Sequence, residues 1–295
     1  MTSTSSSSKR SSREAGPAAR GAAPLYPRKS LGQHFLTDER ILKRIAGAAE
    51  LSRHDTVIEI GAGTGALTAE LAARAGRVVA LELDERLCAQ LAQRFRGTNV
   101  SIVQGDALEF DPASALEATD ESGRYVIAGN LPYYIAQPLL RHFLEAKPPP
   151  QRMIVMLQAE VAKSIAAQPG QMSMLSVSVQ LYGEPRILFH VPPSAFRPPP
   201  KVRSAVVRID VPGTLRAPVA DSEAFFQVVR AGFSARRKQL RNGLANGLRI
   251  DPAKAAALLA DAEIDPTLRP QMLPLAAWAD LTDAWIAAGR PEGRR

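Results

Sequence analysis

The feature that most constrains the fold of this chain is a glycine-rich loop between an apolar run and a helical pattern. Residues 56–60 read as a buried strand, the loop Gly61-Ala62-Gly63-Thr64-Gly65 follows directly, and residues 67–74 have helical periodicity. Glycines at such a junction permit a tight turn and let a ligand approach the backbone closely. This order predicts the first strand–loop–helix unit of an α/β fold.

Further apolar runs repeat this pattern along the chain. Strands are predicted over residues 77–81, 100–103, 125–128 and 153–157, with helical patterns between them such as residues 85–95. Alternating strands and helices imply a parallel sheet covered on both faces. Two late runs, residues 186–190 and 205–210, have no clear helix between them and predict an antiparallel edge.

The two ends of the chain differ in character from this central part. Residues 1–27 are rich in Ser, Ala, Gly, Pro and Arg and predict a disordered basic tail, with an organellar transit peptide as the alternative on composition. Residues 212–218 resemble a linker. Beyond it the chain is predicted to be helical over residues 223–233, 237–248, 252–260 and 274–288. We therefore expect an α/β domain over residues 28–211 and a small all-α domain over residues 218–295.

Composition limits the partners of the protein. The net charge of +8 favours a polyanionic partner such as nucleic acid. A single cysteine, Cys88, excludes an internal disulfide, and four histidines without tight spacing argue against a zinc site. No segment approaches the about 18 apolar residues that a membrane helix needs. We expect neither a metal nor a membrane partner.

Two carboxylates are placed to bind a nucleoside beside the glycine loop. Glu82 ends the second predicted strand, where it can accept hydrogen bonds from the hydroxyls of a ribose. The loop alone leaves a nicotinamide cofactor and S-adenosylmethionine both open. Gly105-Asp106-Ala107 follows the third strand, where a carboxylate can bind the exocyclic amine of adenine. Asp84 is interpreted as a helix cap.

The motif Asn130-Leu131-Pro132-Tyr133 follows the fourth strand, at the sheet edge where α/β folds bind ligands. The N6 lone pair of adenine is delocalised into the ring and is a poor nucleophile. The side-chain oxygen of Asn130 and the main-chain carbonyl of Leu131 can grip its two N–H groups, Pro132 stiffens the turn, and Tyr133 can stack on the base. Methyl transfer depends on positioning more than on a strong base, which fits the absence of a catalytic His or Cys.

With these motifs the sequence resembles the ribosomal RNA adenine dimethylase family, in particular its small-subunit (16S) branch, over about residues 28–281. Four further stretches carry the resemblance: Leu31-Gly32-Gln33-His34-Phe35-Leu36, Gln158-Ala159-Glu160-Val161-Ala162, residues 196–205 beginning Phe196-Arg197-Pro198, and residues 233–242 beginning Phe233-Ser234-Ala235. Three positions depart from the family pattern, namely His34 for the usual Asn, Ala62 for Pro and Ala159 for Lys.

The resemblance implies a Rossmann-like class I S-adenosylmethionine-dependent methyltransferase with a small all-α C-terminal domain. It implies dimethylation of the N6 groups of two adjacent adenosines near the 3′ end of 16S rRNA, in the immature 30S subunit, by a cytoplasmic protein that we expect to be a monomer. The cofactor-binding residues that it implies, with those of the glycine loop, are His34, Leu36, Gly61, Gly63, Glu82, Asp106, Ala107 and Asn130.

A basic stretch in the helical region predicts the RNA-binding surface. No acidic residue occurs between Glu223 and Asp251. We expect Arg237 and Arg241, four residues apart, to share a helical face that contacts phosphates, with strong salt dependence. The full predicted set is Lys201, Arg236, Arg237, Lys238 and Arg241. Phe196 is expected to be a second stacking ring for an extruded adenine, with a core phenylalanine as the alternative.

Three alternative functions are considered. The sister branch of the family methylates an adenine of large-subunit rRNA, but Leu131 and the Phe196-Arg197-Pro198-Pro199-Pro200 stretch favour the small-subunit branch. A ribosome-assembly factor without catalysis would not need an intact glycine loop together with the Asn130 motif. A nicotinamide dehydrogenase would leave that motif and the basic helices unexplained.

Overall fold

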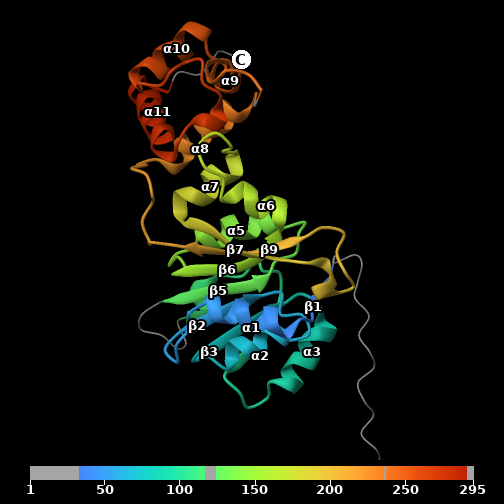
Figure 1. The fold of residues 1–295 in the computed structure, drawn as a ribbon. Helices are drawn as coiled ribbons and strands as arrows, with labels where there is room; N and C mark the ends of the chain where they lie inside the picture. The colour runs from blue at the N-terminus through green and yellow to red at the C-terminus, as the bar shows by residue number, and fades with distance from the viewer. Residues whose placement is uncertain (1–32, 117–123, 236, 291–295) are drawn as a thin grey trace, which may run out of the picture.

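The computed structural model describes residues 33–116, 124–235 and 237–290, and the predicted tail over residues 1–27 lies outside them. Figure 1 shows an α/β part followed by a helical part. The strands are β1 Phe35–Leu36, β2 Thr56–Ile60, β3 Arg77–Glu82, β4 Val100–Gln104, β5 Tyr125–Asn130, β6 Arg152–Gln158, β7 Glu184–Val191, β8 Phe196–Arg197 and β9 Ser204–Asp210. The helices are α1 Glu39–Ala48, α2 Ala66–Ala72, α3 Glu85–Arg94, α4 Pro112–Leu116, α5 Ala136–Leu144, α6 Ala159–Ile165, α7 Met174–Tyr182, α8 Ser222–Phe233, α9 Leu240–Gly247, α10 Pro252–Asp261 and α11 Leu275–Ala287.

Seven strands form one sheet in the order β4-β3-β2-β5-β6-β9-β7. Strands β2 to β6 run parallel, and β9 pairs antiparallel with both β6 and β7. The predicted strands and the predicted antiparallel edge are therefore confirmed. In this register Ile60 lies opposite both Leu81 and Gly129, so the carboxyl ends of β2, β3 and β5 meet at one edge.

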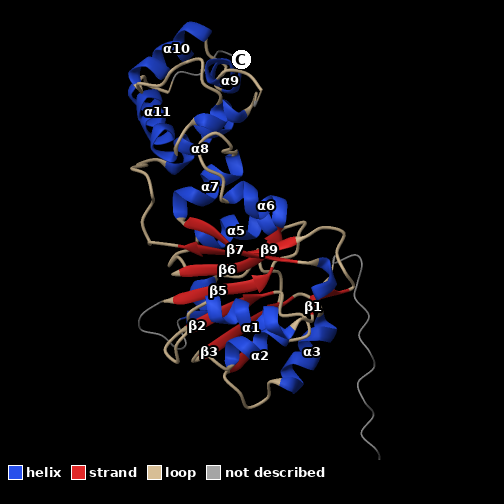
Figure 2. Ribbon diagram, in the orientation of Figure 1, coloured by secondary structure: helices blue, strands red, loops and turns tan. Residues whose placement is uncertain are grey.

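Alternation along the strands divides the core into two layers (Figure 2). In β6, Met153, Val155 and Leu157 pack in the layer that contains α5, whereas Ile154 and Met156 pack in the layer that contains α1 and α2. Successive side chains of a strand point to opposite faces, so an apolar run without alternation indicates a strand buried on both sides. The sheet is thus covered by apolar packing on both faces.

The glycine loop needs residues without a side chain. Gly61, Gly63 and Gly65 all have positive φ angles, a region that L-residues with a side chain seldom adopt. A Cβ on Gly65 would lie 2.7 Å from the side chain of Leu91 in α3, and one on Gly63 would lie 3.2 Å from the ring of Phe35. Close packing and the required backbone conformation therefore both select glycine here.

The helical part contains its own core, built around buried side chains such as Trp278, Trp285 and Phe225. Residues of α7, for example Val177 and Leu181, belong to the same cluster, so the helical part packs directly on the α/β part. Figure 1 shows α8 lying beside α7. Asp221 caps α8 by accepting a hydrogen bond from the N–H of Ala224 at 3.0 Å.

The predicted helix over residues 237–248 is wrong at its start. Helix α9 begins at Leu240 after an extended Gln239, and the N–H of Leu240 donates to the carbonyl of Leu268 at 2.7 Å. This tertiary contact fixes where the helix starts. Arg237 lies before α9, so it does not share a helical face with Arg241, contrary to the prediction. Leu240 and Leu244 are fully buried.

Within the described ranges, no helix is both long enough and apolar enough to cross a membrane. The same residues contain no group of three or more His, Cys, Asp or Glu side chains that could hold a metal ion.

Candidate active site

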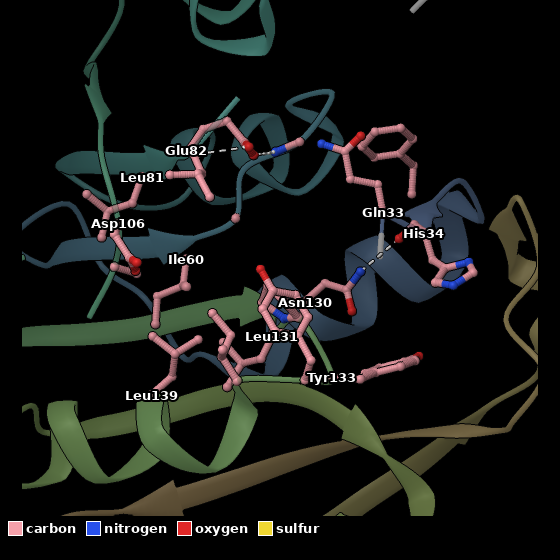
Figure 3. A pocket seen from close by; sticks show the side chains of 18 of the residues that line it. Gln33, His34, Ile60, Leu81, Glu82, Asp106, Asn130, Leu131, Tyr133 and Leu139 are labelled. Carbon is pink, nitrogen blue, oxygen red and sulfur yellow. Dashed lines mark hydrogen bonds between the residues drawn. The ribbon is translucent and has the colours of Figure 1, made fainter. Parts of the chain in front are cut away.

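A cleft opens at the carboxyl edge of the sheet, where the ends of β2, β3, β4 and β5 meet (Figure 3). One wall comes from the segment that precedes β1, and the other from the turn between β5 and α5. The lining residues are Gln33, His34, Phe35, Ile60, Gly61, Gly63, Leu81, Glu82, Leu83, Gly105, Asp106, Ala107, Asn130, Leu131, Pro132, Tyr133, Tyr134, Ile135 and Leu139. The cleft thus joins three motifs that are far apart in the sequence.

Glu82 ties the glycine loop to the end of β3. Its Oε2 accepts a hydrogen bond from the N–H of Gly63 at 2.8 Å, and its Oε1 accepts from the N–H groups of Leu83 and Asp84 at 3.0 Å each. A carboxylate has about four acceptor positions. Three are used within the protein, which leaves capacity for about one further donor in the cleft. Asp84 caps α3 through the N–H of Arg86, as predicted.

Asp106 lies at the end of β4, on the far side of the cleft from Asn130 (Figure 3). Its Oδ1 accepts a hydrogen bond from the N–H of Leu108 at 2.9 Å, which holds the side chain in a tight turn. Apolar side chains, among them Ile60 and the exposed Leu83, line the same cleft. Two carboxylates beside apolar side chains suit a nucleoside, whose ribose carries hydroxyl donors and whose flat base carries an amino donor.

The Asn130 motif forms the other end of the cleft. The Nδ2 of Asn130 donates to the main-chain carbonyl of His34 at 3.0 Å, so the planar amide directs its Oδ1 away from that carbonyl (Figure 3). The N–H of Leu131 donates to the carbonyl of Met156 in β6 at 3.2 Å, which holds the turn on the sheet. Neighbouring elements thus position the side-chain oxygen of Asn130 and the main chain at Leu131.

The ring of Tyr133 is fixed at its outer end. Its hydroxyl lies 2.6 Å from that of Ser204, the first residue of β9. Burial raises the pKa of the Tyr133 hydroxyl above its ordinary value, although the Ser204 hydrogen bond lowers it in part. The hydroxyl is therefore neutral at physiological pH, and the ring offers an uncharged face to the cleft.

A second carboxyl group, Glu59, lies behind the glycine loop. Its side chain is fully buried, and its Oε2 has no hydrogen-bond partner among the described residues. Burial raises the pKa of Glu59 to about 8, with a lowering contribution from Thr68 and a raising one from the nearby Glu82. This carboxyl group is therefore largely protonated near neutral pH.

Comparison with known proteins identifies the family of the chain. The profile of the ribosomal RNA adenine dimethylase family matches residues 26–281, nearly all of the described chain. This chain belongs to that family. The resemblance noted from the sequence is confirmed, as is the α/β class with a helical C-terminal part.

Relatives within the family are close. Proteins named ribosomal RNA small subunit methyltransferase A are 45% identical in Dehalococcoides mccartyi strain CBDB1, covering 87% of this chain and 88% of theirs, and 46% identical in Pelotomaculum thermopropionicum, covering 90% and 93%. The crystal structure of the 23S rRNA methyltransferase ErmE is 27% identical with a TM-score of 0.67, covering 85% of this chain and 98% of that one. A dimethyladenosine transferase from Plasmodium falciparum shares the fold, with a TM-score of 0.72 at 24% identity, covering 87% and 98%.

The cleft brings together most of the predicted site residues. Those that line it are His34, Gly61, Gly63, Glu82, Asp106, Ala107, Asn130, Leu131, Pro132 and Tyr133. Leu36 is buried and lines a small hollow that adjoins the cleft behind the glycine loop, together with Glu59. Lys201, Arg237, Lys238 and Arg241 lie outside the cleft, and Arg236 is outside the described residues.

Phe196 does not present the free stacking face that was predicted. Its side chain is fully buried in the core layer that contains α1, where it lies opposite Leu36 in the β1–β8 pair. Pairing between β8 and β1 turns the ring toward the core, so the alternative of a core phenylalanine describes this structure.

Several cleft residues were not predicted from the sequence. Leu83 and Tyr134 lie next to predicted residues and are exposed, and Gln33 lies beside His34. An apolar residue directly after a strand-ending acid, or a second tyrosine after Tyr133, was the signal that could have identified them. Ile60, Leu81 and Leu139 read as ordinary core residues, and their position at the cleft depends on where the strands end.

Proposed function

We propose that this protein transfers methyl groups from S-adenosylmethionine to the N6 amino groups of two adjacent adenosines near the 3′ end of 16S rRNA. Family membership and the names of its relatives support the reaction class and the small-subunit substrate. The observation that carries the proposal is a single cleft with nucleoside-binding carboxylates at one end and the Asn130 motif at the other.

The residues present suit S-adenosylmethionine. The remaining acceptor capacity of Glu82 fits a ribose hydroxyl, Asp106 fits the exocyclic amine of adenine, and apolar side chains such as Leu83 fit the flat ring. The glycine loop lets the ligand approach the backbone closely. When bound, the cofactor supplies an electrophilic methyl group on a positively charged sulfur.

The chain's own contribution to the reaction is orientation. We assign to the Oδ1 of Asn130 and the main-chain carbonyl of Leu131 the role of accepting the two N–H groups of the target adenine. This grip would draw the N6 lone pair out of the ring and aim it along the cleft, and the ring of Tyr133 would stack on the base. The methylated nitrogen is acidic enough to release its proton to water.

The helical part would hold the RNA. Arg237 and Lys238 are exposed in the segment before α9, and Lys201 is exposed in the segment before β9. We assign residues 28–211 to catalysis and residues 218–295 to RNA binding, with the immature 30S subunit as substrate. Subunit assembly would place the protein in the cytoplasm, and we propose that it acts as a monomer.

The test is transfer of labelled methyl groups to isolated 30S particles and to 50S-derived RNA, followed by identification of the modified nucleoside by mass. We expect dimethyladenosine in the small-subunit RNA alone. Label only in the large-subunit RNA would instead favour the activity in the name of ErmE, to which the chain is less similar in sequence. Absence of label in both, with 30S binding retained, would leave an assembly factor without catalysis.

A further inference from the structure

Helix α1 carries three cations on the face that does not pack on the sheet. Apolar residues of the helix, such as Ile41 and Ile45, are buried in the core layer beneath it, whereas Arg40, Lys43 and Arg44 are exposed. Residues three and four positions apart are neighbours on a helix, so these cations, the α1 surface, lie close together. The outer face of α1 therefore concentrates positive charge on a short stretch of helix.

The cations of the α1 surface have no carboxylate partner, unlike other arginines of the α/β part. The guanidinium of Arg74 lies 2.8 Å from Glu70, and that of Arg141 lies 2.8 Å from Glu145. Among the described residues, the α1 cations form no ion pair, although Glu39 lies in the first turn of the helix. Like charges four positions apart destabilise a helix. The arrangement therefore becomes favourable only when an anion covers it.

Arg44 is held in place by an aromatic ring. Its guanidinium carbon lies 3.8 Å from the centroid of the Phe189 ring in β7. This contact is an electrostatic attraction between the cation and the face of the ring. It leaves the N–H groups at the edge of the guanidinium available, and their planar fork matches two oxygens of a phosphate group.

The α1 surface adjoins the segment that lies beside the cleft. Thr37, just before α1, donates from its N–H to the carbonyl of Ala195 at 2.9 Å, and β1 pairs with β8 (Figure 1). Farther along the same segment, the carbonyl of Pro198 lies 2.8 Å from the Nδ1 of His34, which lines the cleft. The exposed cations of this segment are Arg197, Lys201 and Arg203. Positive charge thus extends from α1 toward the cleft.

The chemistry of the α1 surface favours a phosphate backbone over a membrane. Side chains three or four positions apart on a helix have Cβ atoms about 5–6 Å apart, so the cations can contact neighbouring phosphates. A helix that binds a lipid surface also needs apolar side chains on its exposed part. The apolar residues of α1 are instead packed in the core. Ribosomal RNA is the polyanion that the proposed function already brings to the adjoining cleft.

We propose that the α1 surface is a second RNA-binding surface, on which Arg40, Lys43 and Arg44 hold the phosphate backbone of ribosomal RNA beside the cleft. This inference rests on the proposed function and goes beyond it, because that proposal assigns RNA binding to residues 218–295. RNA is then held by the α/β part as well as by the helical part, so the strand that carries the target adenosines is anchored near the cleft itself.

The test measures binding of the double variant Arg40→Glu/Lys43→Glu to 30S particles and to protein-free 16S rRNA at several salt concentrations. Arg44 stays unchanged because its contact with Phe189 also supports the fold. We expect weaker binding to both forms of the RNA. The log–log slope against salt should become shallower by about 1.4–1.8, which corresponds to two phosphates at about 0.7–0.9 each. The melting temperature and the Kd of S-adenosylmethionine check that the fold and the cleft are intact.

A matched control is Lys147→Glu/Lys163→Glu, which changes the net charge by the same amount. Both lysines are exposed, one after α5 and one in α6, and these helices pack in the core layer on the other face of the sheet. The control should retain the slope of the unchanged protein. Equal weakening in the two double variants would assign the effect to net charge and overturn the proposal.

Two further outcomes would also overturn the α1 surface. One is an unchanged salt slope in Arg40→Glu/Lys43→Glu at normal stability. The other is weaker binding to 30S particles with unchanged binding to protein-free rRNA, which would identify an acidic ribosomal protein as the partner. Binding is measured independently of methyl transfer. A failure of the unchanged protein to methylate 30S particles would therefore refute the proposed function, and the binding data would still decide whether α1 contacts RNA.

Discussion

The hydroxyl of Tyr133 lies 2.6 Å from the hydroxyl of Ser204, which joins the turn after β5 to the start of β9. This bond holds the ring that we assign to base stacking. Tyr133→Phe keeps the ring and removes the bond, so we expect kcat/KM for 30S particles to fall only about three- to tenfold, in line with one ordinary hydrogen bond. Tyr133→Ala removes the ring and should reduce kcat/KM considerably more.

For both variants, kcat/KM is measured from methyl transfer to 30S particles. The control is Tyr134→Phe. Tyr134 is exposed beside Tyr133, and the base stacking assigned to Tyr133 does not depend on the hydroxyl of Tyr134. An equal decrease in Tyr133→Phe and Tyr133→Ala would mean that the hydroxyl, and not the ring, is what the reaction requires.

Asn130→Ala should abolish methyl transfer and leave RNA binding largely intact. The substitution removes the oxygen assigned to the adenine amine together with the hydrogen bond to the His34 carbonyl. Removing one hydrogen-bonding group that stabilises the reacting centre lowers kcat by about a hundredfold or more. Single-turnover methyl transfer and a 30S binding assay test the two parts separately, and a failure of 30S binding would contradict the role assigned to Asn130.

Glu82→Ala should weaken binding of S-adenosylmethionine by about ten- to hundredfold, because hydrogen bonds to a charged group each contribute about 1.5–3 kcal/mol. The effect includes the support that the carboxylate gives to Gly63 as well as the hydrogen bond assigned to the ribose. Isothermal titration calorimetry measures the Kd. Glu85→Gln is the control, since Glu85 is exposed in the first turn of α3. Unchanged affinity in Glu82→Ala would refute the assignment.

The buried carboxyl group of Glu59 should make stability depend on pH. Its pKa is about 8 in the folded protein against an ordinary value of 4.5. Between these values the folded state keeps a proton that the unfolded state has released, so the free energy of unfolding falls as pH rises toward about 8 and levels off above it. Glu59→Gln has no proton to lose and should not show this fall.

Thermal unfolding of both proteins at pH values from about 5 to about 8.5 tests this prediction. The melting temperature of Glu59→Gln should rise relative to that of the unchanged protein as pH increases across this range. A constant difference between the two proteins would mean that Glu59 titrates at its ordinary value despite its burial.

Reversing charge in the segment before α9 should weaken RNA binding. Arg237 and Lys238 are both exposed there, and the stretch between Glu223 and Asp251 contains no acidic residue. The double variant Arg237→Glu/Lys238→Glu should bind 30S particles more weakly and with a shallower salt dependence. The log–log slope should change by about 0.7–0.9 for each phosphate that the variant no longer neutralises. Lys254→Glu on α10 is the control. Equal weakening in both variants would indicate a general effect of net charge.

Much of the fold could be read from the sequence because its signals are local. Strands β2, β3, β5 and β6 are apolar runs bounded by turns, and they occur where they were predicted. The start of α9 was misplaced because the helical pattern continues through residues 237–239, while a hydrogen bond from Leu240 to Leu268 fixes the actual start. Local periodicity carries no information about such a contact.

Some features of the candidate site could likewise be identified from the sequence, whereas others depend on tertiary contacts. Glu82, Asp106 and Asn130 were identified from the sequence because each follows an apolar run, and parallel strands bring their carboxyl ends to one edge of the sheet. Phe196 was assigned a stacking role with a core position only as the alternative, and the nearly parallel arrangement of the His34 and Tyr133 rings was not predicted. Both follow from the arrangement of the segments before β1 and around β8, which are distant in the sequence.

By itself, therefore, the sequence determined the α/β class, the family, the order of the elements and the residues at the strand ends, since all of these depend on local pattern and motif spacing. Only the tertiary structure decided which aromatic ring faces Tyr133, how much acceptor capacity Glu82 retains, and why Glu59 keeps a raised pKa. The physical reason is that side-chain orientation and desolvation depend on contacts between segments far apart in the chain.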